Sequence, residues 1–343
     1  MLESFFSIST FEPLNSMMKH PLSLRGTLSG TIQQLTASDA RLTMIDDDFD
    51  AGLLQQWVGK TEVLHDVVRP ETAAALAATL DYPDAPRAGE PLPPLWHWTN
   101  FYAIAQQSQL GEDGHPKRGG FLPPVPLPRR MWAGGRFVFH APIPVGSSVA
   151  RTSTIRSVSA KEGSSGRLVF VTVRHEISRD GQLAITEEHD IVYRGMPTPG
   201  SAAPPPKPAP LNPRWSRTIH PDPVLLFRYS ALTFNGHRIH YDRTYVTEVE
   251  GYPGLIVHGP LIATLLVDLV RREVPGVEIA EFRFRAVSPL FDIDAFSVCG
   301  EPAADGKTIK LWAQNSRGEL AMEAEAILHA PPLCQYNLRH LPD

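Results

Sequence analysis

Two stretches in the second half of the chain decide how the rest is interpreted. The first, Phe227–Asp242, is FRYSALTFNGHRIHYD, and the second, Gly254–Leu261, is GLIVHGPL. The second contains a Gly-Pro step, and proline is favoured in the first turn of a helix, so we predict a helix that begins at Gly259. Residues 261–270 are apolar on nearly every side until Arg271. Such a helix has to be buried all round, inside the core of the fold.

Segments that alternate apolar and polar residues, as strands do, surround this helix. In the first half, a predicted strand at Glu62–Val68 precedes a predicted helix at Pro70–Leu80. Further strands are predicted at Arg136–Ile143, Ser147–Val158, Arg167–Ile177, Leu183–Tyr193, Glu278–Val287, Asp294–Gly300, Thr308–Gln314 and Leu320–His329. Helix first and strand meander second thus occur twice. This order predicts an α+β fold with an antiparallel sheet curled round an apolar helix, although a core helix in another α+β fold would explain the apolar residues equally well.

Proline density marks the clearest boundary. Residues 197–213 are PTPGSAAPPPKPAPLNP, a composition that favours extended polyproline II and acts as a semi-rigid spacer. We therefore predict a flexible lead-in at 1–45, an N-terminal domain at 46–196, a linker at 197–213, a C-terminal domain at 214–332 and a tail at 333–343.

Composition excludes several classes of function. The 343 residues carry a net charge of −5, which argues against nucleic acid as a partner because phosphate binding needs a basic surface. The longest apolar run, Leu261–Val270, is much shorter than the roughly 20 residues that cross a bilayer, so we expect no membrane span. Only Cys299 and Cys334 are present, too few for a disulfide framework. We expect a cytoplasmic protein.

The segments Tyr229–His240 and Ile256–Gly259 together resemble the motif of the MaoC-like (R)-specific enoyl-CoA hydratases, also called hydratase 2 enzymes, in the same register. Phe234 stands where these enzymes commonly have Gly, Asn235 replaces the catalytic Asp, and His-Arg at 237–238 replaces Asn-Pro. This variant is similar to the double-hot-dog subgroup, which includes mesaconyl-C4-CoA and itaconyl-CoA hydratases and mitochondrial 3-hydroxyacyl thioester dehydratases.

The resemblance implies a double hot-dog fold, with two antiparallel sheets each curled round a central apolar helix, and a degenerate N-terminal copy. It implies reversible hydration of an enoyl thioester to an (R)-type 3-hydroxyacyl thioester. The expected substrate is a short-chain or C4/C5 dicarboxylic acyl-CoA such as mesaconyl-C4-CoA or itaconyl-CoA. No cofactor is implied beyond the coenzyme A of the substrate.

The chemistry needs a group for the water, a group for the proton and a donor for the thioester oxygen. His240 matches the catalytic histidine of the family, and imidazole exchanges protons near neutral pH. Gly259 matches the family's oxyanion glycine at the positive end of the helix dipole. An amide such as Asn235 can orient water but cannot take its proton. A competing hypothesis is that Asp242 or His237 replaces the lost carboxylate.

Five residues are candidates for substrate contacts: Tyr229, His258, Arg238, Arg285 and Arg130. Arg285 alternates with phenylalanines on a predicted strand, so its guanidinium should leave the apolar side, where it could meet coenzyme A. Arg130 and Arg238 are candidates for the free carboxylate of a dicarboxylic substrate, because a carboxylate in a dry pocket needs a cation.

Structural roles are alternatives for several of these residues. His258 could cap or pack against the start of the helix, and Asp242 could pair with Arg238 or Arg243. His97 is expected to pack beside aromatic residues. The segment Arg129–Arg136 resembles the subgroup's substrate-facing loop.

Other functions remain open at this level. They are a 3-hydroxyacyl-ACP dehydratase of fatty acid synthesis, a hot-dog thioesterase and a non-catalytic acyl-thioester binding module. The sequence contains no Cys cluster or HExxH that would predict a metal site. The resemblance also allows a homodimer.

Overall fold

The computed structural model describes residues 51–163, 166–196 and 205–329. The predicted lead-in at 1–45, the predicted tail at 333–343 and part of the predicted linker therefore lie outside the described residues. The domain boundaries stay predictions. Within the described part of the chain, no helix is long and apolar enough to span a membrane.

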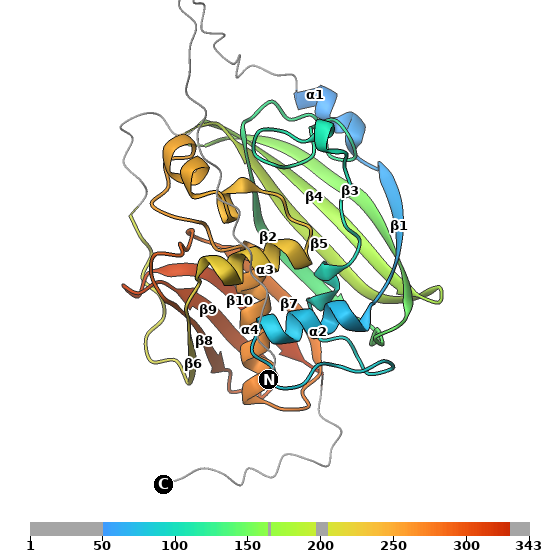
Figure 1. Ribbon diagram of the computed structural model, residues 1–343, viewed down its shortest axis with the longest axis vertical. Helices are drawn as coiled ribbons and strands as arrows, with labels where there is room; N and C mark the ends of the chain where they lie inside the picture. The colour runs from blue at the N-terminus through green and yellow to red at the C-terminus, as the bar shows by residue number, and fades with distance from the viewer. Residues whose placement is uncertain (1–50, 164–165, 197–204, 330–343) are drawn as a thin grey trace, which may run out of the picture. The chain divides into compact units, whose positions relative to one another are not determined.

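Ten strands form one antiparallel sheet (Figure 1). The strands are β1 (Thr61–Val67), β2 (Arg129–Phe139), β3 (Ser148–Gly163), β4 (Gly166–Arg179), β5 (Gln182–Arg194), β6 (Trp215–Ile219), β7 (Ile279–Ala286), β8 (Phe296–Pro302), β9 (Thr308–Gln314) and β10 (Leu320–Leu328). Their order across the sheet is β1-β3-β4-β5-β2-β7-β10-β9-β8-β6. Outward from the centre, the first half runs β2, β5, β4, β3, β1 and the second half runs β7, β10, β9, β8, β6, so equivalent strands of the two halves have equivalent neighbours. This confirms the predicted repeat, although β6 was not predicted from the sequence.

The two halves join where β2 pairs with β7. Gly134 of β2 lies opposite Arg285 of β7, and a Cβ atom on this glycine would be only 2.6 Å from the carbonyl oxygen of Phe284. The absence of a side chain therefore permits the close approach. Because the strands continue across this junction, the expected two separate sheets are not found. The predicted loop Arg129–Arg136 is likewise corrected, since this segment is the first part of β2.

The described helices are α1 (Ala51–Leu54), α2 (Pro70–Thr79), α3 (Pro223–Leu232) and α4 (Gly259–Glu273), with 3-10 or π turns between some of the elements. Helix α4 begins at Gly259, as predicted, and every residue in 261–270 is buried. It packs against β6, β8, β9 and β10 (Figure 1). Its one buried carboxylate, Asp268, is neutralised by Arg217 at 2.6 Å and Arg272 at 2.8 Å.

The first half does not have an equivalent of α4. Helix α2 packs against α3 and against a 3-10 turn at Trp96–Thr99. Between Thr79 and Arg129, all of which is described, the chain forms only short 3-10 turns. A central helix therefore lies against the second half alone, and the expectation of one in each half is corrected.

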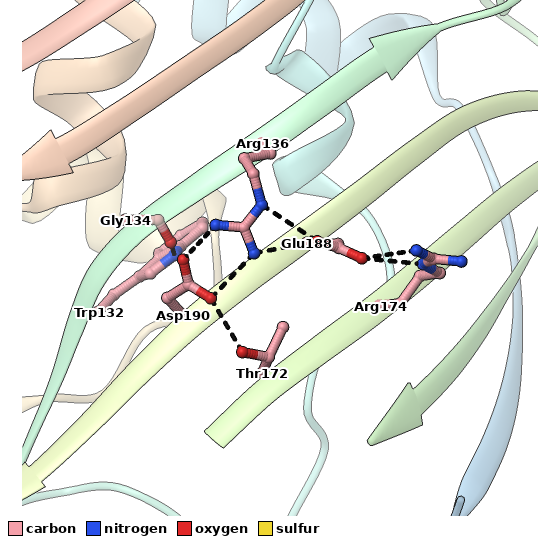
Figure 2. Close-up of polar contacts among 7 residues, drawn as sticks. All are labelled: Trp132, Gly134, Arg136, Thr172, Arg174, Glu188 and Asp190. Carbon is pink, nitrogen blue, oxygen red and sulfur yellow. Dashed lines mark hydrogen bonds and ion pairs between the residues drawn. The ribbon is translucent and has the colours of Figure 1, made fainter. Parts of the chain in front are cut away.

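The two faces of the sheet differ in chemistry. Figure 2 shows Arg136 of β2 between Glu188 and Asp190 of β5, with Arg174 on the far side of Glu188. These cross-strand ion pairs lie on the outer face. Glu187, the residue before Glu188, points to the inner face and is only 2% exposed. Successive residues of a strand alternate between faces, so this register separates the surface charges from the buried side on which α4 lies.

Candidate active site

Helix α3 and the turn after it position Asn235. The helix begins with Asp222 as its cap and ends at Leu232; two residues later, Phe234 adopts a left-handed φ of 50°. The side-chain oxygen of Asn235 then accepts a hydrogen bond from the backbone N–H of His237 at 3.0 Å. Its Nδ2 has no partner among the described residues. Asn235 therefore has amide N–H groups to offer a ligand, while its oxygen is used locally.

His240 lies in the following 3-10 turn and is 7% exposed. Its Nδ1 lies 2.7 Å from the carbonyl oxygen of Ile256. A carbonyl only accepts hydrogen bonds, so Nδ1 carries the hydrogen and Nε2 keeps its lone pair. Burial lowers the pKa of His240 to about 4; the hydrogen bond to Ile256 opposes this shift and the charge of His115 adds to it. The ring is therefore a neutral proton acceptor at neutral pH.

The start of α4 lies directly beside this ring. The imidazole of His258 stacks on that of His240, with ring centroids 3.7 Å apart and an angle of 18° between planes. His258 is fully buried; its Nε2 lies 2.8 Å from the Ser230 hydroxyl, and Tyr229 packs edge-on at 5.1 Å. The prediction that His258 packs at the helix start is confirmed. Tyr229, only 2% exposed, supports His258 from the core.

Gly259 follows His258 as the first residue of α4. A Cβ atom at this position would meet nothing within 4 Å, so there is open space beside its backbone. The first amides of a helix have no carbonyl partner within the helix, and the helix dipole makes this end positive. The His240 ring, with its acceptor lone pair, thus stacks on His258, the residue that precedes these helix N–H groups. This arrangement can take a proton from water and stabilise a developing oxyanion.

A loop from the first half completes the site, and the sequence analysis missed it. Nδ1 of His115 lies 3.0 Å from a carboxylate oxygen of Asp113. The ring of His115 lies 4.0 Å from that of His237, which in turn lies 5.4 Å from that of His240, centroid to centroid. The only local signal was the short Asp-Gly-His sequence, which is also typical of a surface turn.

Asp113, His115 and His237 also form a group that could hold a metal ion, since one ligand atom from each lies within 4.8 Å of the others. The sequence predicted no metal site. Burial is the main cause of the lowered pKa values of His115 and His237, and the positive charge of Arg130 contributes to both. The Asp113 carboxylate acts in the opposite direction and raises the pKa of both rings.

The candidate arginines lie in different places. Arg238 donates to Asp242 at 2.7 Å, so the predicted pairing of Asp242 is confirmed. This guanidinium also contacts the loop at the carbonyl oxygen of Glu112 (3.0 Å), and it is therefore already occupied. Arg285 leaves β7 away from the apolar side, as predicted, and pairs with Glu323 at 2.7 Å. The structure does not bring Arg285 together with His240, and its contact with coenzyme A stays a prediction.

Arg130, by contrast, faces the inner side of the sheet. It lies opposite Tyr193 in the β2–β5 pairing. Tyr193 is fully buried; burial raises the pKa of its hydroxyl, whereas the charge of Arg130 and a hydrogen bond with it lower this pKa. Arg130 has no ion pair with an acidic residue in the described ranges. A half-buried cation beside a buried hydroxyl is a favourable position for a carboxylate.

A cluster of buried polar groups lies on the inner face of the first half. Glu187 accepts a hydrogen bond from the Trp98 indole at 2.8 Å, and Nε2 of His97 lies 2.8 Å from its other oxygen. Burial alone would raise the pKa of Glu187, but the imidazoles of His189 and His97 more than offset this and hold it well below its ordinary value. His97 also packs against the rings of Trp98 and Phe137, which confirms its predicted packing with aromatic residues.

Comparison with known proteins agrees with these features. Residues 95–292 match the family model described as hydroxyacyl-thioester dehydratase type 2. The mesaconyl-C(4)-CoA hydratase of Chloroflexus aurantiacus is 50% identical over 272 residues, which is 78% of this chain and 95% of that protein. The mitochondrial hydroxyacyl-thioester dehydratase type 2 of Schizosaccharomyces pombe is 30% identical over 233 residues, 61% of this chain and 77% of that protein.

The fold has solved counterparts. A MaoC-like dehydratase from Phytophthora capsici is similar with a TM-score of 0.55 and 13% identity, covering 82% of this chain and 99% of that one. At this identity the likeness shows the fold alone, that of a MaoC-like dehydratase, here with one large antiparallel sheet and few helices. The chain is therefore a hydro-lyase that belongs to the hydroxyacyl-thioester dehydratase type 2 family of MaoC-like enzymes.

Proposed function

We propose that this hydro-lyase acts on a C4/C5 dicarboxylic enoyl-CoA and interconverts it with the (R)-type 3-hydroxyacyl-CoA. The proposal is supported by the 50% identity to a protein named mesaconyl-C(4)-CoA hydratase. The observation that carries the chemistry is the position of His240, whose Nε2 is free to accept a proton and whose ring stacks against the residue before Gly259.

The reaction follows from the free groups. The Nδ2 amide of Asn235 donates to the oxygen of a water molecule, which donates one O–H to Nε2 of His240. A lone pair of the water attacks the β-carbon, and the π electrons move toward the thioester oxygen, where the N–H of Gly259 stabilises the enolate. His240 then returns the proton to the α-carbon on the same face. This syn addition gives the (R)-type product, and dehydration is the reverse.

The free carboxylate of the substrate would bind Arg130, with the hydroxyl of Tyr193 as a further donor. This assignment replaces Arg238, whose guanidinium already holds Asp242. An ionised carboxylate in a partly dry pocket is stabilised chiefly by a charged hydrogen-bond donor. An acyl chain that lacks the carboxylate would leave Arg130 unpaired.

The substrate assignment can be tested with three thioesters. Mesaconyl-C4-CoA, itaconyl-CoA and crotonyl-CoA are compared by the loss of conjugated-thioester absorbance, and the chirality of each product is determined. The dicarboxylic substrates should give the higher kcat/KM. Equal turnover of crotonyl-CoA would remove the need for a carboxylate partner. Release of free coenzyme A without a hydroxyacyl product would indicate a thioesterase, and binding without turnover would indicate a binding module.

An arginine variant makes the test specific. Arg130→Met should lower kcat/KM for the dicarboxylic substrates by about a hundredfold, the equivalent of a charged hydrogen bond of nearly 3 kcal/mol, and far less for crotonyl-CoA. Arg285→Met is the matched control, because any contact with the shared carrier affects all substrates equally. Equal losses for both substrate classes in Arg130→Met would contradict the carboxylate site.

The remaining parts of the proposal concern the setting of the reaction. We propose coenzyme A rather than acyl carrier protein as the carrier, no metal or other cofactor, a cytoplasmic location and a homodimer. Coenzyme A as the carrier is supported by the relative named as a CoA hydratase. A reaction without metal or other cofactor is supported by the availability of a protein group for each chemical task. The location is supported by the low cysteine content, and the homodimer by the family resemblance alone. Activity with acyl carrier protein, metal content and sedimentation would test these points.

A further inference from the structure

The loop that carries Asp113 and His115 is fixed against the active-site motif. The backbone N–H of Arg238 donates to the carbonyl oxygen of Asp113 at 2.9 Å. Gly114 has a φ of 86°, and a Cβ atom there would lie 1.9 Å from the carbonyl oxygen of Gly236. Only glycine fits this approach. The first half of the chain is therefore locked onto the turn that carries the catalytic residues of the second half.

The hydrogen bonds of the loop also fix the chemistry of His115. One oxygen of Asp113 accepts from the backbone N–H of His115 at 3.0 Å, and the other lies 3.0 Å from Nδ1 of its ring. Both carboxylate oxygens of Asp113 thus accept from His115, so Nδ1 of His115 carries the hydrogen and Nε2 keeps a lone pair. An imidazole oriented by a carboxylate is a recurring device for proton work in enzymes.

The Asp113–His115 pair lies close to the part of the motif that lacks a carboxylate, because Gly114 contacts Gly236, the residue after Asn235. The common form of the motif has an aspartate where this chain has Asn235, which accepts no proton. The ring of His237 contacts both other imidazoles: its centroid lies 4.0 Å from that of His115 and 5.4 Å from that of His240. Asp242, the other candidate for the lost carboxylate, is held by Arg238 and by the backbone N–H of Tyr245 at 3.0 Å.

We propose that the Asp113–His115 pair takes the place of the missing carboxylate, with Nε2 of His115 accepting the second O–H of the reacting water. This inference rests on the proposed hydration. The water then donates one O–H to His240 and the other to His115, and accepts an N–H from Asn235. Its remaining lone pair is free to form the bond to the β-carbon. Only the proton on His240 is transferred; the other hydrogen stays on the product hydroxyl, so the atoms and charges balance.

The test combines two substitutions. His115→Phe keeps an aromatic ring of similar size but removes Nε2, and it should lower kcat by about a hundredfold with little change in KM. Adding Asn235→Asp restores a carboxylate to the motif. The fold-change in kcat that Asn235→Asp gives in the His115→Phe variant should be about ten times the fold-change that it gives in the wild type. This ratio corresponds to a coupling free energy of about 1.4 kcal/mol. Circular dichroism and thermal unfolding are measured for every variant.

The experiment has a matched control and three outcomes that would overturn the proposal. Lys117 lies in the same loop and is exposed, and its side chain donates to the carbonyl oxygen of Ser108, so Lys117→Ala should leave kcat unchanged. A folded His115→Phe variant with wild-type kcat would overturn the proposal, as would equal losses with and without Asn235→Asp, which would mean a structural role. Activity that a chelator abolishes and zinc restores would overturn it in favour of a metal site. If the wild type hydrates none of the enoyl thioesters, the proposed function itself fails.

Discussion

The protonation of His240 permits a quantitative test of the site. An imidazole in water has a pKa of about 6.5, whereas burial lowers the pKa of His240 to about 4. Because Nδ1 donates to the carbonyl oxygen of Ile256, Nε2 is the atom that takes up the proton. Only the neutral ring can accept a proton from water. The value of kcat/KM for hydration should therefore stay constant on acidification until the pH approaches the lowered pKa.

The two pKa values predict different rates in mild acid. With an ordinary pKa, about nine-tenths of the rings would be protonated at about pH 5.5, and kcat/KM would be about tenfold below its plateau. With a pKa of about 4, only roughly 3% would be protonated at that pH, and kcat/KM would be almost unchanged. The same shift affects folding. As the pH falls below about 6.5 the unfolded chain binds the proton first, so the free energy of unfolding decreases until the pH reaches the folded-state pKa.

Crotonyl-CoA is the suitable substrate for this assay, because its acyl chain has no carboxyl group that titrates in the same range. Initial rates at low substrate concentration give kcat/KM from mild acid to neutral pH, and circular dichroism at each pH shows that the protein remains folded. A fall in kcat/KM with an apparent pKa near 6.5, in protein that is still folded, would refute the assignment of the buried His240 ring as the proton acceptor.

Three further predictions concern the turn, the loop and the core. Asn235→Ala should lower kcat by about a hundredfold through loss of a water-holding donor, whereas Asp242→Asn should keep most activity because an arginine already holds that carboxylate; the reverse order of turnover would contradict both roles. Gly114→Ala should lower the Tm and the activity together, because its Cβ would lie 1.9 Å from the carbonyl oxygen of Gly236; a wild-type melting curve would argue against the tight docking. Leu266→Ala, at a fully buried position of α4, should lower the free energy of unfolding by about 2–5 kcal/mol in denaturant titrations; a loss below about 1 kcal/mol would mean that the helix is not core.

Much of the fold could be predicted because the signals are local. Alternation along a strand depends only on neighbouring residues, so each predicted strand overlaps an observed one and the outward direction of Arg285 was confirmed. The strand predicted at Arg136–Ile143 was misplaced, since β2 is Arg129–Phe139. Alternation does not show whether Arg285 lies on the same face of the sheet as α4, because this depends on which strands pair across the two halves. Nothing within β2 or β7 indicates that they are partners. One sheet was therefore found where two were expected.

The same distinction applies to the site. Asn235, His240 and Gly259 are close in sequence, and their residue types together with the family resemblance predicted an amide, an imidazole and a helix amide in one place. The tautomer and the lowered pKa of His240 required the carbonyl oxygen of Ile256 and the burial of the ring, which are properties of packing. His115 could not be found from the sequence, because the glycine contact that brings its loop to the turn joins residues more than a hundred positions apart.

The sequence by itself determined the apolar helix, the alternating strands and the set of groups available for acid-base chemistry, because short-range periodicity and side-chain chemistry are written in adjacent residues. The tertiary structure alone decided which imidazole is neutral, which arginine is unpaired and which half of the chain supplies Asp113 and His115. Protonation and pairing depend on burial and on neighbours distant in sequence, and these arise only when the two halves fold against each other.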